Sequence, residues 1–281
     1  MSAVASPVAN AAPSPAYTLS DTGVMVARSL RRSVRDPEAF ITALALPVIL
    51  MLLFVYVFGG AFNAGVHTAA ASAGGGYANY VVPGLIVLCA AYGAGTTSVA
   101  VATDMSTGIV DRFRSMPIAA WTVLAGQIAA SLARNLLATT LVIGVGLAVG
   151  WRPTGGPLDW VGAAGLIVLF IAALSWLAAC FGLLAGSPEA ATGATFGFMF
   201  IPYLSSAFVP PDTMTGVLRP VAANQPFTPL IEAMRGLWMG HTSTGAAVGH
   251  EALLAVGYFG AILLASAALA SWLFRHRTAG R

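Results

Sequence analysis

The chain has 281 residues, of which 58% are hydrophobic and only 8% are charged, and its net charge is +3. Because a soluble domain carries about a quarter charged residues, this composition, with a mean hydropathy of +0.82, indicates an integral membrane protein. The basic residues are dispersed, which argues against nucleic-acid binding. All thirteen are Arg, and since a P-loop needs a Lys beside the phosphates, the chain lacks that kind of ATPase site. The two Cys and four His show no ligand spacing, so no metal site is predicted.

The first part of the chain divides into a tail and a basic segment. Residues 1–21 are rich in Ala, Ser and Pro and are expected to be disordered. In VMVARSLRRSVRDPEAF, which follows, Val26, Leu30 and Val34 recur at helical spacing and Arg residues fill the other side. This pattern predicts an amphipathic helix on an anionic membrane surface. The alternative is a solvated positive flank that only fixes the topology.

Six apolar stretches are long enough to cross a bilayer as helices, which takes about 20 residues. They are expected at about 40–62, 80–103, 121–150, 158–186, 190–209 and 251–274. Arg residues precede the first stretch, separate the second from the third and follow the sixth, so the positive-inside rule places these segments and both termini in the cytoplasm. Trp121, Trp151, Trp160 and Trp272 fall at span ends, as expected of an aromatic belt. The predicted fold class is an all-α integral membrane protein with six transmembrane helices.

The stretch TDMSTGIVDRFRSMPIAAW, residues 103–121, concentrates charge between the second and third spans. On a helical wheel Met105, Ile109, Phe113 and Met116 share one face, and the charged side chains lie opposite. Pro117 ends or kinks such a helix. The pattern predicts a cytoplasmic helix at about 104–117 that lies on the membrane or docks its apolar face on a partner.

This stretch and a second one, SSAFVPPDTMTGVLRPVAANQPFTPLIEAMRGLWMG (205–240), resemble the type-2 permeases of ABC transporters, most of all the daunorubicin-resistance-type drug-exporter permeases. The resemblance extends over residues 22–281. It implies that the helix at 104–117 is a coupling helix that docks onto a separate ATP-binding subunit; the alternative is a surface helix with no partner. The candidate contact and shape residues are Asp104, Gly108, Asp111, Arg112, Arg114 and Pro117.

The resemblance also implies an assembly in the bacterial plasma (inner) membrane. Two ATP-binding subunits would join this chain and a second permease, either another copy or a homologue, with membrane lipid around them. ATP and Mg²⁺ would be held by the partner subunits, so this chain is expected to bind no cofactor and to be no enzyme by itself.

By the same resemblance, spans two and five of two subunits would line a central cavity. The candidate pathway residues are Tyr92, Phe196, Phe198, Met199, Phe200 and Tyr203, because aromatic and Met side chains suit an adaptable apolar cavity. The alternative for each is ordinary helix packing or contact with lipid.

The segment at about 210–245 is expected to form short external helices that partly re-enter the membrane, with Pro226, Pro229, Glu232 and Arg235 as its candidate residues. Thr228 is the predicted N-cap and Pro229 the first helical position. Glu232 and Arg235 are three residues apart and are expected to pair. The pair either holds this external region together or takes part in gating.

One departure from the family concerns the start of span three. Members often carry an acidic residue three positions before an Arg, where this chain has Ser131 ahead of Arg134. Counted from the outer boundary, Arg134 is expected near the cytoplasmic edge of the membrane, where its side chain can snorkel. Structural anchoring is therefore favoured over a role in transport.

The function favoured by these observations is the permease subunit of an ATP-driven exporter of a hydrophobic or amphipathic small molecule. The main alternative is a secondary transporter driven by an ion gradient. Proton-driven carriers place Asp or Glu deep inside their spans, whereas Asp104, Asp159, Glu189 and Glu251 all lie at span ends. An intramembrane enzyme is disfavoured because no His, Asp and Ser constellation stands out.

Overall fold

The computed structural model describes residues 37–60, 76–107 and 120–279 of the chain. The predicted N-terminal tail, most of the predicted amphipathic helix and residues 108–117 of the predicted coupling helix lie outside these residues, as does the side chain of Phe198.

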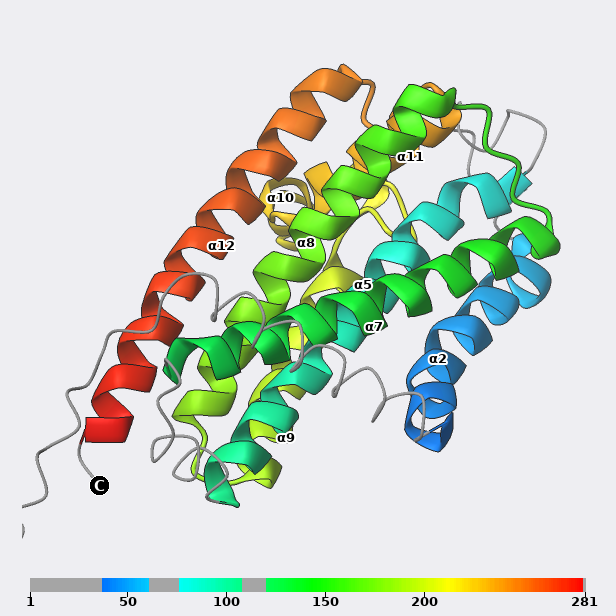
Figure 1. The fold of residues 1–281 in the computed structure, drawn as a ribbon. Helices are drawn as coiled ribbons and strands as arrows, with labels where there is room; N and C mark the ends of the chain where they lie inside the picture. Colours follow the sequence, from blue (N-terminus) through cyan, green and yellow to red (C-terminus); the bar gives the residue numbers. More distant parts are fainter. Residues whose placement is uncertain (1–36, 61–75, 108–119, 280–281) are drawn as a thin grey trace, which may run out of the picture.

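Four long helices dominate the described part of the chain, which contains no β-strand (Figure 1). Each is long and apolar enough to cross a membrane, and together they match the second, third, fourth and sixth predicted spans. They are α5 (Gly76–Ser106), α7 (Ala120–Val149), α8 (Pro157–Leu184) and α12 (Val248–Ala279).

The first predicted span is a helix with a change of winding. It comprises α2 (Pro37–Leu52) and a π-helical turn, η1 (Leu53–Val57). Together they would extend about 31 Å at 1.5 Å per residue, close to the thickness of a bilayer core. Pro47 lies inside α2 and removes one backbone donor there.

The fifth predicted span differs from the single helix expected at 190–209. Helix α9 (Pro188–Met199) ends early and is followed by a 3-10 turn, η2 (Ile201–Leu204), and then by non-helical chain. Pro202 explains the break in part, because it has no backbone N–H to continue the helix. The broken segment still runs antiparallel to α5, from Thr195 beside Gly95 to Phe208 beside Tyr77. That stretch of α5 is about 27 Å long. The broken segment therefore extends over nearly the thickness of a bilayer core, although it is not one continuous helix.

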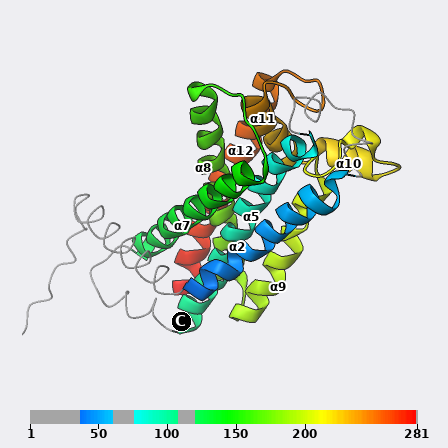
Figure 2. The same cartoon turned by 90° about the vertical axis from the view of Figure 1, so that its right-hand side faces the viewer.

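Helix α5 is the centre of the bundle, and α2, α7, α8, α9 and α11 all contact it. Figure 2 shows α5 enclosed by these neighbours. One close backbone approach involves Gly84, where a Cβ atom would lie 2.7 Å from Cα of Ala207. Any larger residue at position 84 would push the chain after η2 away from α5.

The two ends of the bundle differ. Three short helices, η3 (Pro211–Thr213), α10 (Leu218–Asn224) and α11 (Phe227–Met239), follow the broken segment. In Figure 1, α11 lies beside the start of α12, at what we call the upper end, and α9 lies toward the opposite, lower end, where α12 also ends.

The prediction that Trp151 belongs to an aromatic belt at the membrane interface is wrong. Its side chain is fully buried, and its ring lies 5.0 Å from that of Trp238 and 6.1 Å from that of Trp160. The reason is that the chain after α7 folds back under α11, where Thr154 and Gly155 donate backbone hydrogen bonds to the Trp238 carbonyl. The cluster joins α7, α8 and α11.

Candidate functional site

Helix α9 buries one face on α5 and α8 and leaves the opposite face open. Ala191 and Thr195 are buried, whereas Phe196 and Phe200 are 58% and 50% exposed. The two Phe side chains come from the same exposed face as Gly193 and Gly197, at which an added Cβ would meet no atom within 4 Å. A helix at the edge of a membrane bundle has one side toward lipid even when it has no role in transport. The exposure of this face therefore fits lipid contact as well as a place in the pathway.

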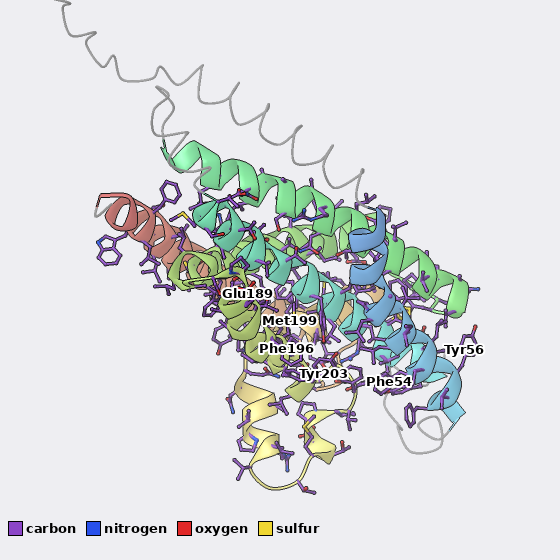
Figure 3. All side chains as sticks on the ribbon, turned by 90° about the horizontal axis from the view of Figure 1, so that it is seen from below. Phe54, Tyr56, Glu189, Phe196, Met199 and Tyr203 are labelled. Carbon is purple, nitrogen blue, oxygen red and sulfur yellow. The ribbon has the colours of Figure 1, made fainter. Side chains whose placement is uncertain are left out.

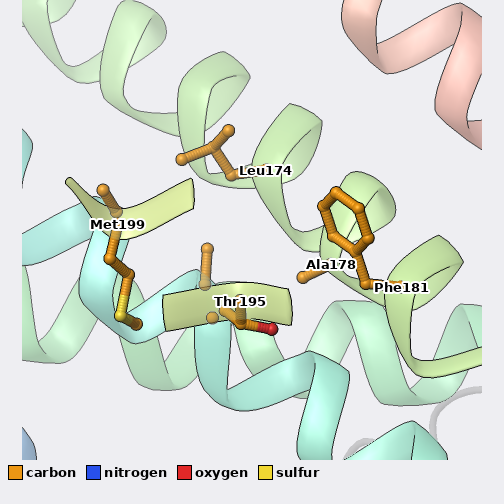
Figure 4. Close-up of a pocket in the computed structure, with 8 residues that line it drawn as sticks. Leu174, Ala178, Phe181, Thr195 and Met199 are labelled. Atoms are coloured by element: carbon orange, nitrogen blue, oxygen red, sulfur yellow. The ribbon is translucent and has the colours of Figure 1, made fainter. Parts of the chain in front are cut away.

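The buried face of α9 is held close to α5 by Gly95. A Cβ atom at Gly95 would lie 2.4 Å from Cε of Met199 and 2.8 Å from Cγ2 of Thr195. The same contact borders a small apolar pocket between α5, α8 and α9 that is partly open to the surroundings (Figure 4). Its lining residues are Ala91, Ala94, Gly95, Leu174, Ala178, Phe181, Thr195 and Met199.

The structure thus divides the predicted pathway residues into two groups. Met199 packs inward against α5 and lines the pocket, while Phe196 and Phe200 belong to the open face. Tyr92 on α5 joins them through Tyr203 of η2, because the two hydroxyl groups lie 3.1 Å apart and share a hydrogen bond. Figure 3 shows Phe196, Met199 and Tyr203 following one another along this side of the bundle.

At the lower end, Asp104 belongs to the last turn of α5 and not to a separate helix that begins there. The reason is that α5 remains helical through the polar residues at its C-terminal end. The Thr103 hydroxyl donates to the Val99 carbonyl at 2.8 Å and the Ser106 hydroxyl to the Thr103 carbonyl at 3.0 Å, so these side chains are satisfied within the helix. The other predicted coupling residues, Gly108, Asp111, Arg112, Arg114 and Pro117, lie outside the described residues.

Asp104 accepts a hydrogen bond from the Gln127 side chain of α7. This contact joins α5 and α7, the two helices that flank the charged insert in the sequence. The sequence analysis did not identify Gln127 as a contact residue. Its position one turn before Ser131, on the same side of the helix, was the signal that could have identified it.

Gln127 begins a polar stripe on α7, in which Ser131, Asn135 and Thr139 follow at four-residue intervals, all buried. Ser131 shares hydrogen bonds with Thr97 of α5 and Ser175 of α8, and Asn135 donates to the Ala90 carbonyl at 3.2 Å. Such interhelical hydrogen bonds hold membrane helices together. Ser131, where family members often carry an acid, is therefore a packing residue here, and Arg134 beside it is half-buried.

At the upper end, Glu232 and Arg235 form an ion pair in which both side chains are fully buried. The Arg235 guanidinium also donates to the carbonyls of Tyr80 at 2.9 Å and Ser206 at 3.1 Å, and to the Ser243 hydroxyl at 3.1 Å. Ser243 in turn donates its backbone N–H and its hydroxyl to the Glu232 carboxylate, both at 2.6 Å. One buried pair thus ties α11 to α5, to the chain after η2 and to the loop before α12.

The surroundings of this pair favour the ionised form of Glu232. Burial of the Glu232 carboxyl opposes its ionisation, but the Arg235 charge and the hydrogen bonds from Ser243 outweigh that cost, and the pKa of Glu232 stays below its ordinary value. Sequence spacing indicated the pair, but Tyr80, Ser206 and Ser243 could not be found from spacing because they are distant in the chain.

The predicted N-cap of α11 is wrong. The helix starts at Phe227 with Pro226 as its cap, and Pro229 stands at the third helical position. Thr228 instead donates its hydroxyl to the Ala222 carbonyl and accepts a 3.3 Å hydrogen bond from the Ser206 backbone N–H. Its side chain bridges α10 and the chain after η2, and the first turn of α11 tolerates Pro229 because its N–H groups have no helical acceptor.

Comparison with known proteins gives a consistent result. Residues 20–239 match the family model described as ABC-2 type transporter. The chain is 29% identical over 229 residues to the daunorubicin resistance ABC transporter permease protein DrrB1 of Streptomyces coeruleorubidus, an alignment covering 81% of this chain and 78% of that protein. Two Mycobacterium tuberculosis proteins are also similar. The probable doxorubicin resistance ABC transporter permease protein DrrC is 28% identical, with 76% of this chain and 75% of that protein covered, and the permease protein DrrB is 24% identical, with 74% and 72% covered.

Proposed function

The chain belongs to the ABC-2 type transporter family, and we propose that it is the membrane permease subunit of an ATP-driven exporter that moves a hydrophobic or amphipathic small molecule out of the cell. The observation that carries this proposal is the family match, which runs from the basic segment before α2 to the end of α11. The proposed cargo is drug-like or lipid-like, and the names of the relatives, which are drug-resistance permeases, support the drug-like class.

The proposed arrangement has six spans, formed by α2 with η1, by the broken segment of α9 and η2, and by the four long helices. The lower end faces the cytoplasm of a bacterial cell and the upper end faces outward. Two ATP-binding subunits bind ATP and Mg²⁺, and hydrolysis of the ATP supplies the energy. This chain and a second permease, identical or homologous, form the path of the cargo.

The proposed coupling runs through the insert at about 104–117. Because Asp104 is fixed to Gln127, motion of the docked insert would move the ends of α5 and α7 together. The bundle would then change from inward-open to outward-open as a rigid-body switch. At the other end, the buried Glu232–Arg235 pair would hold α11 onto the outer end of α5.

A co-purification experiment tests this function. The protein is extracted from its host in a mild detergent as wild type and as a variant with Asp104, Asp111 and Arg114 changed to Ala. A matched control changes Asp212 and Arg219 to Ala, since that ion pair is exposed at the upper end. We expect a Walker-type ATPase to co-purify with wild type and control, and to be lost or uncoupled in the first variant. Transport without any associated ATPase would favour the ion-gradient carrier.

A further inference from the structure

The turn η2 divides the fifth predicted span into two parts that pack differently. Above the turn, residues 205–208 are all buried. Below it, most of α9 is exposed or only partly covered. Of the residues of α9 whose exposure the structure describes, only Ala191 and Thr195 are buried. The upper part is therefore built into the bundle, whereas α9 lies on its surface.

Hydrogen bonds fix the upper part to two other helices. The Ser206 carbonyl accepts one from the Tyr80 hydroxyl of α5 at 2.9 Å and another from the Arg235 guanidinium of α11 at 3.1 Å. The backbone N–H of Ser206 donates to the Thr228 hydroxyl of α11 at 3.3 Å. All of these groups are buried, and leaving buried polar groups unpaired costs free energy. Any displacement of this part relative to α5 and α11 is thus unfavourable.

Helix α9 is held against the bundle in another way. The hydroxyl groups of Thr192 and Thr195 donate to carbonyls of α9 itself. Its contact with α5 consists of apolar atoms, because Cγ2 of Thr195 and Cε of Met199 lie against Gly95. Apolar contact is non-directional. A shift of α9 against α5 therefore leaves none of these polar groups unpaired.

The described part of the chain leaves room on both sides of α9. The apolar pocket between α5, α8 and α9 lies along its buried face (Figure 4). On the opposite face, a Cβ atom added at Gly193 or Gly197 would meet no atom within 4 Å. Neither face is thus completely packed by this chain.

Both ends of α9 have the geometry of a pivot. At the upper end, η2 is a 3-10 turn containing Pro202, which has no backbone N–H to bond. A short 3-10 stretch inside a helical segment often marks a hinge. At the lower end only residues 185–187 connect α8 to α9. Three extended residues reach about 10 Å, so this connection does not fix the end of α9 rigidly.

One hydrogen bond joins α5 to the upper pivot. The hydroxyl groups of Tyr92 on α5 and Tyr203 in η2 lie 3.1 Å apart, and both side chains are partly buried. A single hydrogen bond between neutral groups contributes little net free energy. It can therefore hold the pivot in one position and still break when the position changes.

We propose that α9 is a gate for the lower half of the transport path. It pivots on η2 while the chain above η2 stays in place, and the hydrogen bond between Tyr92 and Tyr203 is the latch that holds it against α5. This inference rests on the proposed exporter function and identifies a part of the bundle that moves. In this account Tyr92 and Tyr203 position the gate.

The test measures cysteine accessibility in the complete complex with its ATP-binding subunits in lipid nanodiscs. The buried Cys89 and Cys180 are first changed to Ala. Thr195→Cys on α9 is then compared with Ser206→Cys above η2, since both original side chains are buried and close to Cys in size. Alkylation of the permease by N-ethylmaleimide is followed by mass spectrometry, without nucleotide and with ATP and vanadate. We expect the rate for Thr195→Cys to differ at least about tenfold between the two conditions, and Ser206→Cys to react slowly in both.

A second variant tests the latch. Tyr203→Phe keeps the ring and removes the hydroxyl group. It should raise the rate for Thr195→Cys without nucleotide about fivefold, as expected for the loss of one hydrogen bond, and leave Ser206→Cys slow. The matched control is Tyr258→Phe, which removes a hydroxyl group from an exposed Tyr of α12 and should change neither rate.

Three results would overturn the inference: a rate for Thr195→Cys that is the same in both conditions, equal rates for Thr195→Cys and Ser206→Cys, or an unchanged rate in Tyr203→Phe. An unfolding midpoint equal to that of the Cys-free protein shows that each variant is folded. If such a failure occurs in a complex that hydrolyses ATP and transports its cargo, the exporter function stands and only the gate is wrong. If no ATP-binding subunit associates, the exporter function fails, while the Tyr203→Phe comparison, which needs no nucleotide, still decides whether the latch holds α9.

Discussion

Arg235 reaches from α11 to the start of α5, where its guanidinium carbon lies 3.9 Å from the ring centroid of Tyr80 and its Nη2 donates to the Tyr80 carbonyl at 2.9 Å. A guanidinium in this position is satisfied by the ring, two carbonyls, a hydroxyl and the Glu232 carboxylate. The upper end of the bundle therefore depends on a single buried cation.

We expect Arg235→Ala to destabilise the protein strongly, because it leaves Glu232 as an uncompensated buried charge, an effect of about 3–5 kcal/mol in other proteins. The measurement is the thermal unfolding midpoint of the purified protein in detergent. Arg219→Ala is the control, since its pair with Asp212 is exposed and such pairs contribute little. Equal midpoints for the two variants would show that the buried pair does not hold α11 in place.

The same pair predicts a pH dependence. Because the pKa of Glu232 is lower in the folded state than its unfolded value of about 4.3, its contribution to stability is complete at neutral pH. It is lost as the pH falls below that value and through the folded pKa. The unfolding midpoint of wild type should thus approach that of Glu232→Gln as the pH decreases from 7 to 3. A difference that stays constant over this range would contradict the assignment.

Gly95 is expected to control the packing of α9. Gly95→Val would place branched atoms where a Cβ is already 2.4 Å from Met199, and overpacking typically costs about 1–3 kcal/mol. We expect lower stability and reduced transport, with partial recovery when Met199 is also changed to Ala. Gly193→Ala is the matched control, because that position faces open space. Absence of recovery in the double variant would mean that Met199 is not the obstructing group.

The Asp104–Gln127 contact is expected to matter for coupling more than for folding. Gln127→Leu removes a donor to a carboxylate at the end of the bundle, and such hydrogen bonds contribute about 1.5–3 kcal/mol. We expect the complex to assemble, while stimulation of its ATPase by cargo falls several-fold. Ser131→Ala, deeper on the same stripe, serves as a comparison that keeps the Asp104 contact. Normal stimulation in Gln127→Leu would remove this contact from the coupling route.

Sequence patterns predicted the parts of the fold that depend on local composition. Apolar length located the four long helices, because a bilayer demands about 20 apolar residues in a row. Helical spacing indicated that Glu232 and Arg235 pair. The charged insert stood out because charge is rare in this chain, although helix α5 extends past Asp104 and includes it.

Features that depend on distant contacts could not be predicted. Pro202 alone does not explain why the helix breaks after Met199. The chain that follows is also held by Tyr77, Tyr80 and Arg235, whose side chains donate hydrogen bonds to its backbone carbonyls. Apolar composition alone does not distinguish such a segment from a continuous helix. Likewise, Phe54 joins Phe208 across two spans, and no sequence spacing relates residues so far apart. Trp151 was assigned to a membrane interface by its position at a span end, but its burial depends on Trp238.

The most direct test of the exporter function is ATP-dependent uptake of rhodamine 6G into inside-out membrane vesicles that contain the permease and its ATP-binding subunits. The proposal predicts that the dye accumulates only with hydrolysable ATP, that a protonophore does not abolish accumulation, and that changing Asp104, Asp111 and Arg114 to Ala does. Accumulation driven by an imposed pH gradient without ATP, and unaffected by those changes, would contradict it and identify an ion-gradient carrier.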